Sequence, residues 1–277
     1  MKLEGKVAIV TGGGTGIGRA IAGRLVADGA SVCVAGPWYE ALETTAASLP
    51  AERVATCVAD VTDPADVDGI IRTALAFGQG LHVLVNNAGI LEPVGGVVDL
   101  DPALWTRVVQ VNLTGPFLMM KAAIPHMIEA GGGSIVNVSS VAGLLGVPGQ
   151  PAYCASKGGL ISLSKQVAVD YGVNKVRCNV VCPASTKTEM LVGNMTSFAE
   201  ICGLEVESVL TAFCQDTPLR RVAGPEELAG LCSFLASDDA GFVTAAVIPV
   251  DGGATAVDVS GAALNRLVHT ASDRRRA

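Results

Sequence analysis

A tyrosine and a lysine one helical turn apart are the residues with the clearest chemical potential in this sequence. Tyr153 and Lys157 are four positions apart, so in a helix both side chains lie on one face. A tyrosine has a pKa near 10 and is a poor base at neutral pH. A lysine ammonium group within about 4–6 Å lowers such a pKa by about 1–3. Ser140, which closes a preceding apolar run, can hydrogen-bond a carbonyl or alcohol oxygen, so the three residues predict proton exchange with such an oxygen.

A glycine-rich turn at residues 11–18 follows the first apolar run. A dinucleotide pyrophosphate needs close backbone approach, N–H groups that point at it and a helix N-terminus behind it. Gly12, Gly16 and Gly18 would supply the turn, the close approach and the packing of helix on strand. The placement of the turn between a strand and a helix therefore predicts a dinucleotide site.

Two further apolar runs end in small or polar residues. In a parallel sheet these ends share the rim that carries the glycine turn, and an acid followed by a small apolar residue can hold an adenine ring. A plain strand-ending cap explains each of them equally well. The residues concerned are Asp60, Val61, Asn87, Ala88 and Gly89.

The elements that must position these groups alternate along the chain. Apolar runs occur at 6–10, 31–35, 54–58, 81–85, 134–138, 176–181 and 245–250. Helical segments are expected between them, at 16–28, 41–48, 63–77, 102–130 and 152–171, and from 224 onward. This rhythm predicts an α/β fold, a Rossmann-like doubly wound parallel sheet of about seven strands with helices on both faces.

The chain contains no linker rich in proline, serine or charge between these runs. We therefore expect a single dinucleotide-binding catalytic domain over residues 1–255 and a C-terminal extension over 256–277. Residues 184–222 break the rhythm, and we expect them to form an irregular, apolar substrate lid at the carboxyl edge of the sheet.

Composition narrows the classes of partner. The 277 residues include 26 acidic and 19 basic side chains, and the net charge of −7 argues against nucleic acid. The longest stretch without charge, residues 130–156, is too polar for a membrane span, and no signal peptide is recognisable. The eight cysteines form no C-x-x-C pair and the three histidines have no ligand spacing, so we expect free thiols, no metal site and a cytoplasmic location.

Taken together, these motifs resemble those of the short-chain dehydrogenase/reductase family, over nearly the whole chain. Residues 11–18 match its T-G-x-x-x-G-x-G signature. The other motif positions follow in order at Asp60, residues 86–89, Asn112, Ser140, Tyr153 and Lys157.

The resemblance implies roles for the catalytic residues. Tyr153 would be the acid/base and Ser140 would orient the substrate oxygen. Lys157 would lower the pKa of Tyr153 and hold the nicotinamide ribose. Asn112 would bend its helix and hold a water in a proton relay to Lys157.

The resemblance also implies a set of residues around the dinucleotide. Thr186 and Thr188 would grip the nicotinamide carboxamide, and Asn87 would lie against the cofactor. The full set is Gly12, Thr15, Gly16, Ile17, Gly18, Asp60, Val61, Asn87, Ala88, Gly89, Tyr153, Lys157, Thr186 and Thr188.

Two positions depart from the family pattern. Ala184 follows Pro183 where the family has glycine. At the end of the second run, Gly36 and Pro37 stand where an acid would select NAD, and no arginine is placed to select NADP. Either NAD or NADP therefore fits. A homotetramer or homodimer is expected from the resemblance.

The lid is rich in methionine, leucine and phenylalanine, which favours an apolar secondary alcohol or ketone of a steroid-, terpenoid- or polyketide-like kind. The leading hypothesis is an NAD(P)-dependent alcohol dehydrogenase/ketoreductase. Alternatives are a 3-oxoacyl thioester reductase and a dinucleotide-binding sensor without turnover. A sugar-nucleotide epimerase would need a larger C-terminal domain.

Overall fold

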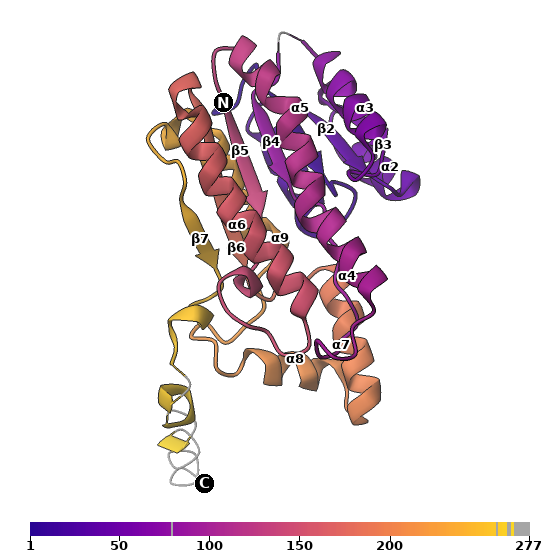
Figure 1. Ribbon diagram of the computed structural model, residues 1–277, viewed down its shortest axis with the longest axis vertical. Helices are drawn as coiled ribbons and strands as arrows, with labels where there is room; N and C mark the ends of the chain where they lie inside the picture. The colour runs from indigo at the N-terminus through magenta and orange to yellow at the C-terminus, as the bar shows by residue number, and fades with distance from the viewer. Residues whose placement is uncertain (79, 259, 265–266, 269–277) are drawn as a thin grey trace.

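The computed structural model describes residues 1–78, 80–258, 260–264 and 267–268, and a parallel sheet forms its centre (Figure 1). Within the described residues the sheet has seven strands in the order β3-β2-β1-β4-β5-β6-β7, which confirms the predicted fold class. The strands are β1 Val7–Thr11, β2 Ser31–Gly36, β3 Val54–Val58, β4 Val83–Asn86, β5 Gly133–Val138, β6 Val176–Pro183 and β7 Val247–Val250.

Helices follow the strands and cover the sheet. They are α1 Gly16–Ala27, α2 Tyr39–Ala47, α3 Pro64–Leu75, α4 Pro102–Val109, α5 Gly115–Glu129, α6 Pro151–Tyr171, α7 Glu189–Cys202, α8 Val206–Cys214 and α9 Pro225–Ala236. Helices α3 and α4 begin in the same way, since Asp63 and Asp101 each accept a hydrogen bond from a backbone N–H of the first turn and proline stands at the first helical position.

Alternate residues of the central strands enter one of two large apolar cores. Ile9 and its neighbours pack with α3, α5 and α6 on the face toward the viewer, whereas Val10 and its neighbours pack with α1 and α9 on the other face (Figure 1). Both faces of the strands are therefore buried, which explains why the strands read as continuous apolar runs rather than alternating ones.

The order of the strands creates a switch point between β1 and β4. From β1 the chain builds outward through β2 and β3, then crosses back so that β4 pairs with β1 on its other side, with Val10 beside Val85. The connections that leave β1 and β4 therefore run in opposite directions, and ligands of such sheets bind in the crevice that opens there. The glycine turn and residues 86–89 border this crevice.

One expectation about helices was met with a refinement and one was wrong. The segment 102–130 is helical from Pro102 to Glu129, and a π-helical turn at Gln110–Thr114 divides it into α4 and α5. The segment 184–222 contains α7 and α8 rather than irregular chain. Thr188 starts α7 by accepting a hydrogen bond from the Leu191 N–H at 3.2 Å, and Gly203, with φ 65°, ends it. Figure 1 shows α7 and α8 beyond the carboxyl ends of the strands.

All eight cysteines are unpaired. Burial raises the pKa of the Cys33, Cys178 and Cys232 thiols to about 12, whereas Cys202 on α7 is exposed. Among the described residues no three His, Cys, Asp or Glu side chains gather as a metal-ion site, and no helix is long and apolar enough to cross a membrane.

Candidate active site

Tyr153 and Lys157 project from the same face of α6, and Ser140 lies where the chain leaves β5. The Lys157 Nζ atom is 5.6 Å from the centre of the Tyr153 ring. The Ser140 hydroxyl is hydrogen-bonded to the Tyr153 phenol, and the Ser140 Oγ also accepts from the Ala142 N–H at 3.1 Å. The structure therefore brings the three residues together.

Burial dominates the protonation of this pair. Lys157 is only 3% exposed, and this burial lowers its pKa to about 8. Its Nζ donates a hydrogen bond to the Val138 carbonyl at 2.9 Å. The pKa of Tyr153 lies above its ordinary value, mainly because burial disfavours the phenolate, while the Ser140 hydrogen bond acts in the opposite direction. The expected net lowering of the Tyr153 pKa is thus not found, because desolvation outweighs the effect of the neighbouring groups.

Asn112 joins the loop after β4 to α6. It is fully buried within the π-helical turn. Its Oδ1 accepts from the Ile90 N–H at 2.8 Å, and its Nδ2 donates to the Ile90 carbonyl at 2.9 Å and to the Ser156 Oγ at 3.1 Å. The side chain is therefore a structural clamp one turn from Tyr153, and its role in a proton relay stays a prediction.

The glycine turn is closed so tightly that side chains would not fit. A Cβ on Gly18 would lie 2.1 Å from the Gly12 carbonyl oxygen. Gly12 and Gly16 adopt φ values of +63° and +47°, in the region that favours glycine. The Asn87 Nδ2 fastens the turn from β4 by donating to the Thr11 and Gly12 carbonyls at 3.0 and 3.2 Å.

This turn fits the pyrophosphate of a dinucleotide. Helix α1 begins at Gly16, its N-cap Thr15 makes no side-chain cap, and its first turn has no acidic residue. The uncapped N–H groups and the positive end of the helix therefore face the crevice, where they suit an anion. Ile17 is partly buried and packs against the core.

The residues expected at the adenine end are already engaged. Asp60 Oδ1 accepts from the N–H and hydroxyl of Thr62, and its Oδ2 pairs with Arg107 at 2.9 Å. The Val61 side chain is buried in the core, so only its backbone faces outward. Ala88 also packs against the core, and the Gly89 backbone lies beside Lys157, whose Nζ would be 3.3 Å from an added Cβ.

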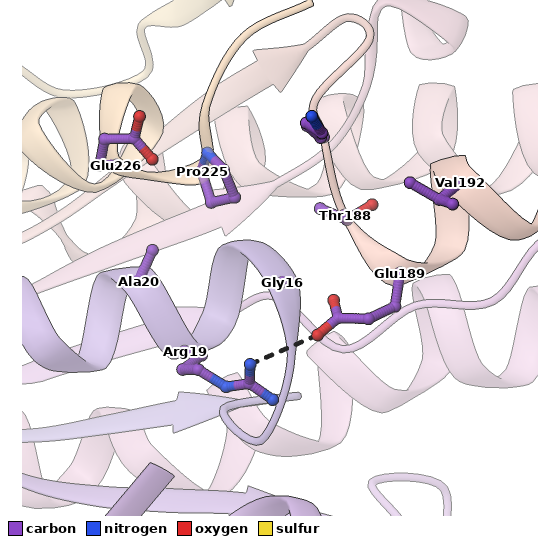
Figure 2. Close-up of a pocket in the computed structure, with 9 residues that line it drawn as sticks. Gly16, Arg19, Ala20, Thr188, Glu189, Val192, Pro225 and Glu226 are labelled. Carbon is purple, nitrogen blue, oxygen red and sulfur yellow. Dashed lines mark ion pairs between the residues drawn. The ribbon is translucent and has the colours of Figure 1, made fainter. Parts of the chain in front are cut away.

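A cavity of about 520 Å³ lies between α1 and the beginning of the predicted lid (Figure 2). The Thr188 methyl group lies over Gly16, 2.9 Å from where a Cβ would stand. An ion pair at 3.4 Å between Arg19 of α1 and Glu189 of α7 spans the cavity edge. Thr186 is buried nearby and donates to the Ala184 carbonyl. The lining residues are Gly16, Arg19, Ala20, Lys187, Thr188, Glu189, Val192, Pro225 and Glu226.

Sequence reasoning missed one buried acid at the site, Glu92. It lies in the loop after β4, and its Oε1 accepts from the Tyr153 backbone N–H at 3.0 Å. The available signal was a single charged residue within the otherwise uncharged stretch 86–98, directly after the residues expected at the dinucleotide.

The family model described as enoyl-(acyl carrier protein) reductase matches residues 12–255, a span that begins in the glycine turn. The chain belongs to the short-chain dehydrogenase/reductase family. Meso-2,3-butanediol dehydrogenase of Serratia marcescens is 39% identical over 258 residues, covering 93% of this chain and 98% of the relative. 2-(S)-hydroxypropyl-CoM dehydrogenase 3 of Xanthobacter autotrophicus is 42% identical over 262 residues, covering 92% and 99%.

A solved structure gives the same assignment. The crystal structure of levodione reductase superposes with a TM-score of 0.88 at 34% identity and covers 92% of this chain and 100% of that chain. As a member of the short-chain dehydrogenase/reductase family, the protein is an oxidoreductase that uses a nicotinamide dinucleotide and interconverts alcohol and ketone groups.

Proposed function

We propose that this protein interconverts an apolar secondary alcohol and its ketone, with Tyr153 as the acid/base. The observation that supports this most directly is the contact of the Tyr153 phenol with the Ser140 hydroxyl, beside a glycine turn that fits a pyrophosphate. A bound nicotinamide supplies the hydride chemistry, so the protein must supply position and a proton.

Four residues of the chain have separate roles in orienting the substrate, transferring the proton, binding the ribose and positioning the loop. Ser140 donates a hydrogen bond to the substrate oxygen and holds it beside the phenol. In ketone reduction Tyr153 gives its proton to that oxygen, and in alcohol oxidation it takes the proton back. Lys157 holds a ribose hydroxyl and, while charged, favours the phenolate. Asn112 keeps the loop after β4 in place against α6.

The surroundings favour an apolar substrate. Large apolar side chains remain exposed on the lid, among them Met190 at 48% and Phe213 at 57%, and Leu144 and Leu145 lie exposed in the loop after Ser140. We assign residues 184–222 as a lid that closes over an uncharged substrate such as a steroid-, terpenoid- or polyketide-like alcohol. Relatives named for 2,3-butanediol and levodione are consistent with an uncharged alcohol or ketone, whereas two relatives named for hydroxycyclohexanecarboxylates make an alicyclic alcohol with a carboxylate the competing substrate class.

The test is a spectrophotometric screen of the purified protein. Absorbance of reduced nicotinamide is followed with alicyclic ketones, small aliphatic ketones and a 3-oxoacyl thioester, and the alcohols are tested in reverse. We expect the highest kcat/KM with an apolar ketone. A preference for the thioester would favour the 3-oxoacyl reductase alternative, and no turnover with any substrate would favour a sensor and overturn the proposal.

The residues that follow β2, where the adenosine ribose of the dinucleotide is expected to bind, carry no charged side chain that would select NAD or NADP. Gly36 closes β2, Pro37 and Trp38 follow it, and the next charged residue is Glu40 in the first turn of α2. We propose that the protein binds NAD and NADP with similar affinity. No acid at this position repels a 2′-phosphate, and no arginine attracts one.

We further propose a homodimer or homotetramer in the cytoplasm. Apolar side chains are exposed on the helices that flank Asn112 and Tyr153, including Trp105, Phe117 and Val169. Eight unpaired cysteines favour a reducing compartment. Sedimentation analysis tests the assembly, and a monomer at micromolar concentration would contradict it.

A further inference from the structure

Glu92 is a nearly inaccessible acid that the proposed chemistry does not use. It is 2% exposed, in the loop between β4 and α4. One carboxylate oxygen accepts from the Tyr153 N–H, whereas Oε2 is buried and has no hydrogen-bond partner among the described residues. A buried carboxylate oxygen without a partner is costly, so its retention needs a reason.

The uncapped first turn of α6 explains why an acid is retained at this position. The N-cap residue Gln150 makes no side-chain cap, and Pro151 has no N–H to donate. The Tyr153 N–H, at the third position of the helix, is one of the donors that a cap normally satisfies. Glu92 supplies that cap from another segment, and the positive end of the 21-residue helix stabilises its charge.

The loop that carries Glu92 is fastened on both sides of it. Before Glu92, Asn112 holds both backbone groups of Ile90. After it, the Gly95 N–H donates to the Gly149 carbonyl at 3.0 Å, just before α6 begins. The carboxylate is therefore held in place against the first turn of α6.

The Tyr153 phenol faces few other groups that carry charge or titrate. Lys157 and Cys154 come from α6 itself, and Cys182 of β6 faces the lysine. Glu92 acts in the same direction as burial and raises the pKa of Tyr153. Among the described residues the carboxylate has one hydrogen-bond partner, the Tyr153 N–H, so its interactions with the protein are directed at the turn that carries the phenol.

We propose that Glu92 is a positioning residue: it caps the helix turn that carries Tyr153, and its buried carboxylate, held against that turn, sets the electrostatic environment of the phenol. This inference rests on the proposed role of Tyr153 as the acid/base. It adds a residue outside the Ser140, Tyr153 and Lys157 set and predicts an effect of charge separate from the effect of the cap.

Two variants separate the cap from the charge. Glu92→Gln keeps an oxygen acceptor for the Tyr153 N–H but removes the charge, so kcat at its optimum should stay within about threefold and the pH midpoint of alcohol oxidation should fall. Glu92→Ala removes both, and kcat should fall by about 10–100-fold because the phenol is no longer held in place. Glu52→Gln, at an exposed position distant in sequence from Glu92, is the control for lost charge and should leave kcat and the pH midpoint of alcohol oxidation unchanged.

A second measurement does not depend on turnover. Tyrosinate absorbance is titrated in the wild type and in Glu92→Gln, each with Tyr153→Phe subtracted to isolate one phenol. A lower pKa in Glu92→Gln supports the proposal even if no substrate is found, whereas an unchanged phenol pKa overturns it. If the pKa moves but Tyr153→Phe keeps full turnover, the proposed function fails and the electrostatic effect of Glu92 stands. If Glu92→Ala does not fold, this titration of Glu92→Gln still decides.

Discussion

The side-chain amide of Asn112 is paired with both backbone groups of Ile90, accepting from its N–H at 2.8 Å and donating to its carbonyl at 2.9 Å. The same amide reaches the Ser156 Oγ, which in turn donates to the Tyr153 carbonyl at 2.8 Å. One buried side chain thus connects the loop after β4 to the helix of the acid/base.

Replacing this amide should loosen the site and weaken the fold. In Asn112→Ala the Ile90 groups and Ser156 lose their partner, so the free energy of unfolding should fall by about 1–3 kcal/mol. Urea unfolding measures this, and kcat should fall as well. Asn174→Ala, at an exposed position, is the control; equal stability of the two variants would argue against the clamp.

Removal of the phenol hydroxyl should abolish proton exchange without affecting dinucleotide binding. Tyr153→Phe should lower kcat by about 10²–10⁴-fold, the usual contribution of a general acid. Fluorescence titration with the reduced dinucleotide should give an unchanged Kd. Tyr171→Phe, on the last turn of the same helix, is the control and should retain activity. If Tyr153→Phe were as active as Tyr171→Phe, the assignment of Tyr153 as the acid/base would be refuted.

A methyl group on the glycine turn should prevent dinucleotide binding. In Gly18→Ala the Cβ would lie 2.1 Å from the Gly12 carbonyl oxygen, so the turn must open. We expect a rise of at least about 100-fold in the dinucleotide Kd, with turnover lost accordingly. Gly23→Ala on the same helix, where the nearest atom is 3.8 Å away, should bind normally and gain about 0.5–1 kcal/mol in stability.

An acid at the end of β2 should create a cofactor preference. An added Cβ on Gly36 meets only Leu42 and Gly12, at 3.8 and 3.9 Å, so the backbone leaves room for a Cβ. Gly36→Asp should favour NADH over NADPH by about tenfold or more, because the carboxylate accepts from the ribose 2′-hydroxyl and repels a 2′-phosphate. Gly36→Ala fills the space without charge and should leave the ratio of kcat/KM values near that of the wild type.

The two reaction directions should respond oppositely to pH. Ketone reduction needs a protonated phenol, and the raised pKa of Tyr153 preserves it through neutral pH, whereas alcohol oxidation needs the phenolate and should accelerate as pH rises. Lys157, with a pKa of about 8, carries its charge only below that value. Profiles of kcat/KM in both directions check this, and an oxidation rate that falls between pH of about 7 and 9 would contradict it. Lys157→Met should move the oxidation midpoint upward.

Much of the framework could be predicted because its signals are local. A strand buried on both faces needs a continuous apolar run such as residues 7–10, and a phosphate-binding turn needs glycine at Gly12, Gly16 and Gly18. The spacing of Tyr153 and Lys157 likewise places them on one helical face whatever surrounds them.

The remainder depends on contacts between distant segments. Nothing next to Glu92 in the sequence shows that it caps a helix that begins about 60 positions later. The protonation of Tyr153 and Lys157 depends on burial by β5, β6 and the loop after β4, so spacing alone gave the wrong direction for Tyr153. The helices α7 and α8 had signals in Thr188 and Gly203 that were outweighed by the expectation of an irregular lid.

The burial of the sulfur atoms has a practical consequence for handling the enzyme. Thiolate is the form that reacts with oxidants and alkylating agents, and thiols with a pKa of about 12, such as Cys33, Cys178 and Cys232, contain almost none of it at neutral pH. Exposed Cys202 offers a maleimide dye direct access at the end of α7. A label there, with the partly exposed Cys57 and Cys154 replaced by serine, would report movement of that helix while the buried thiols of the sheet stayed unmodified.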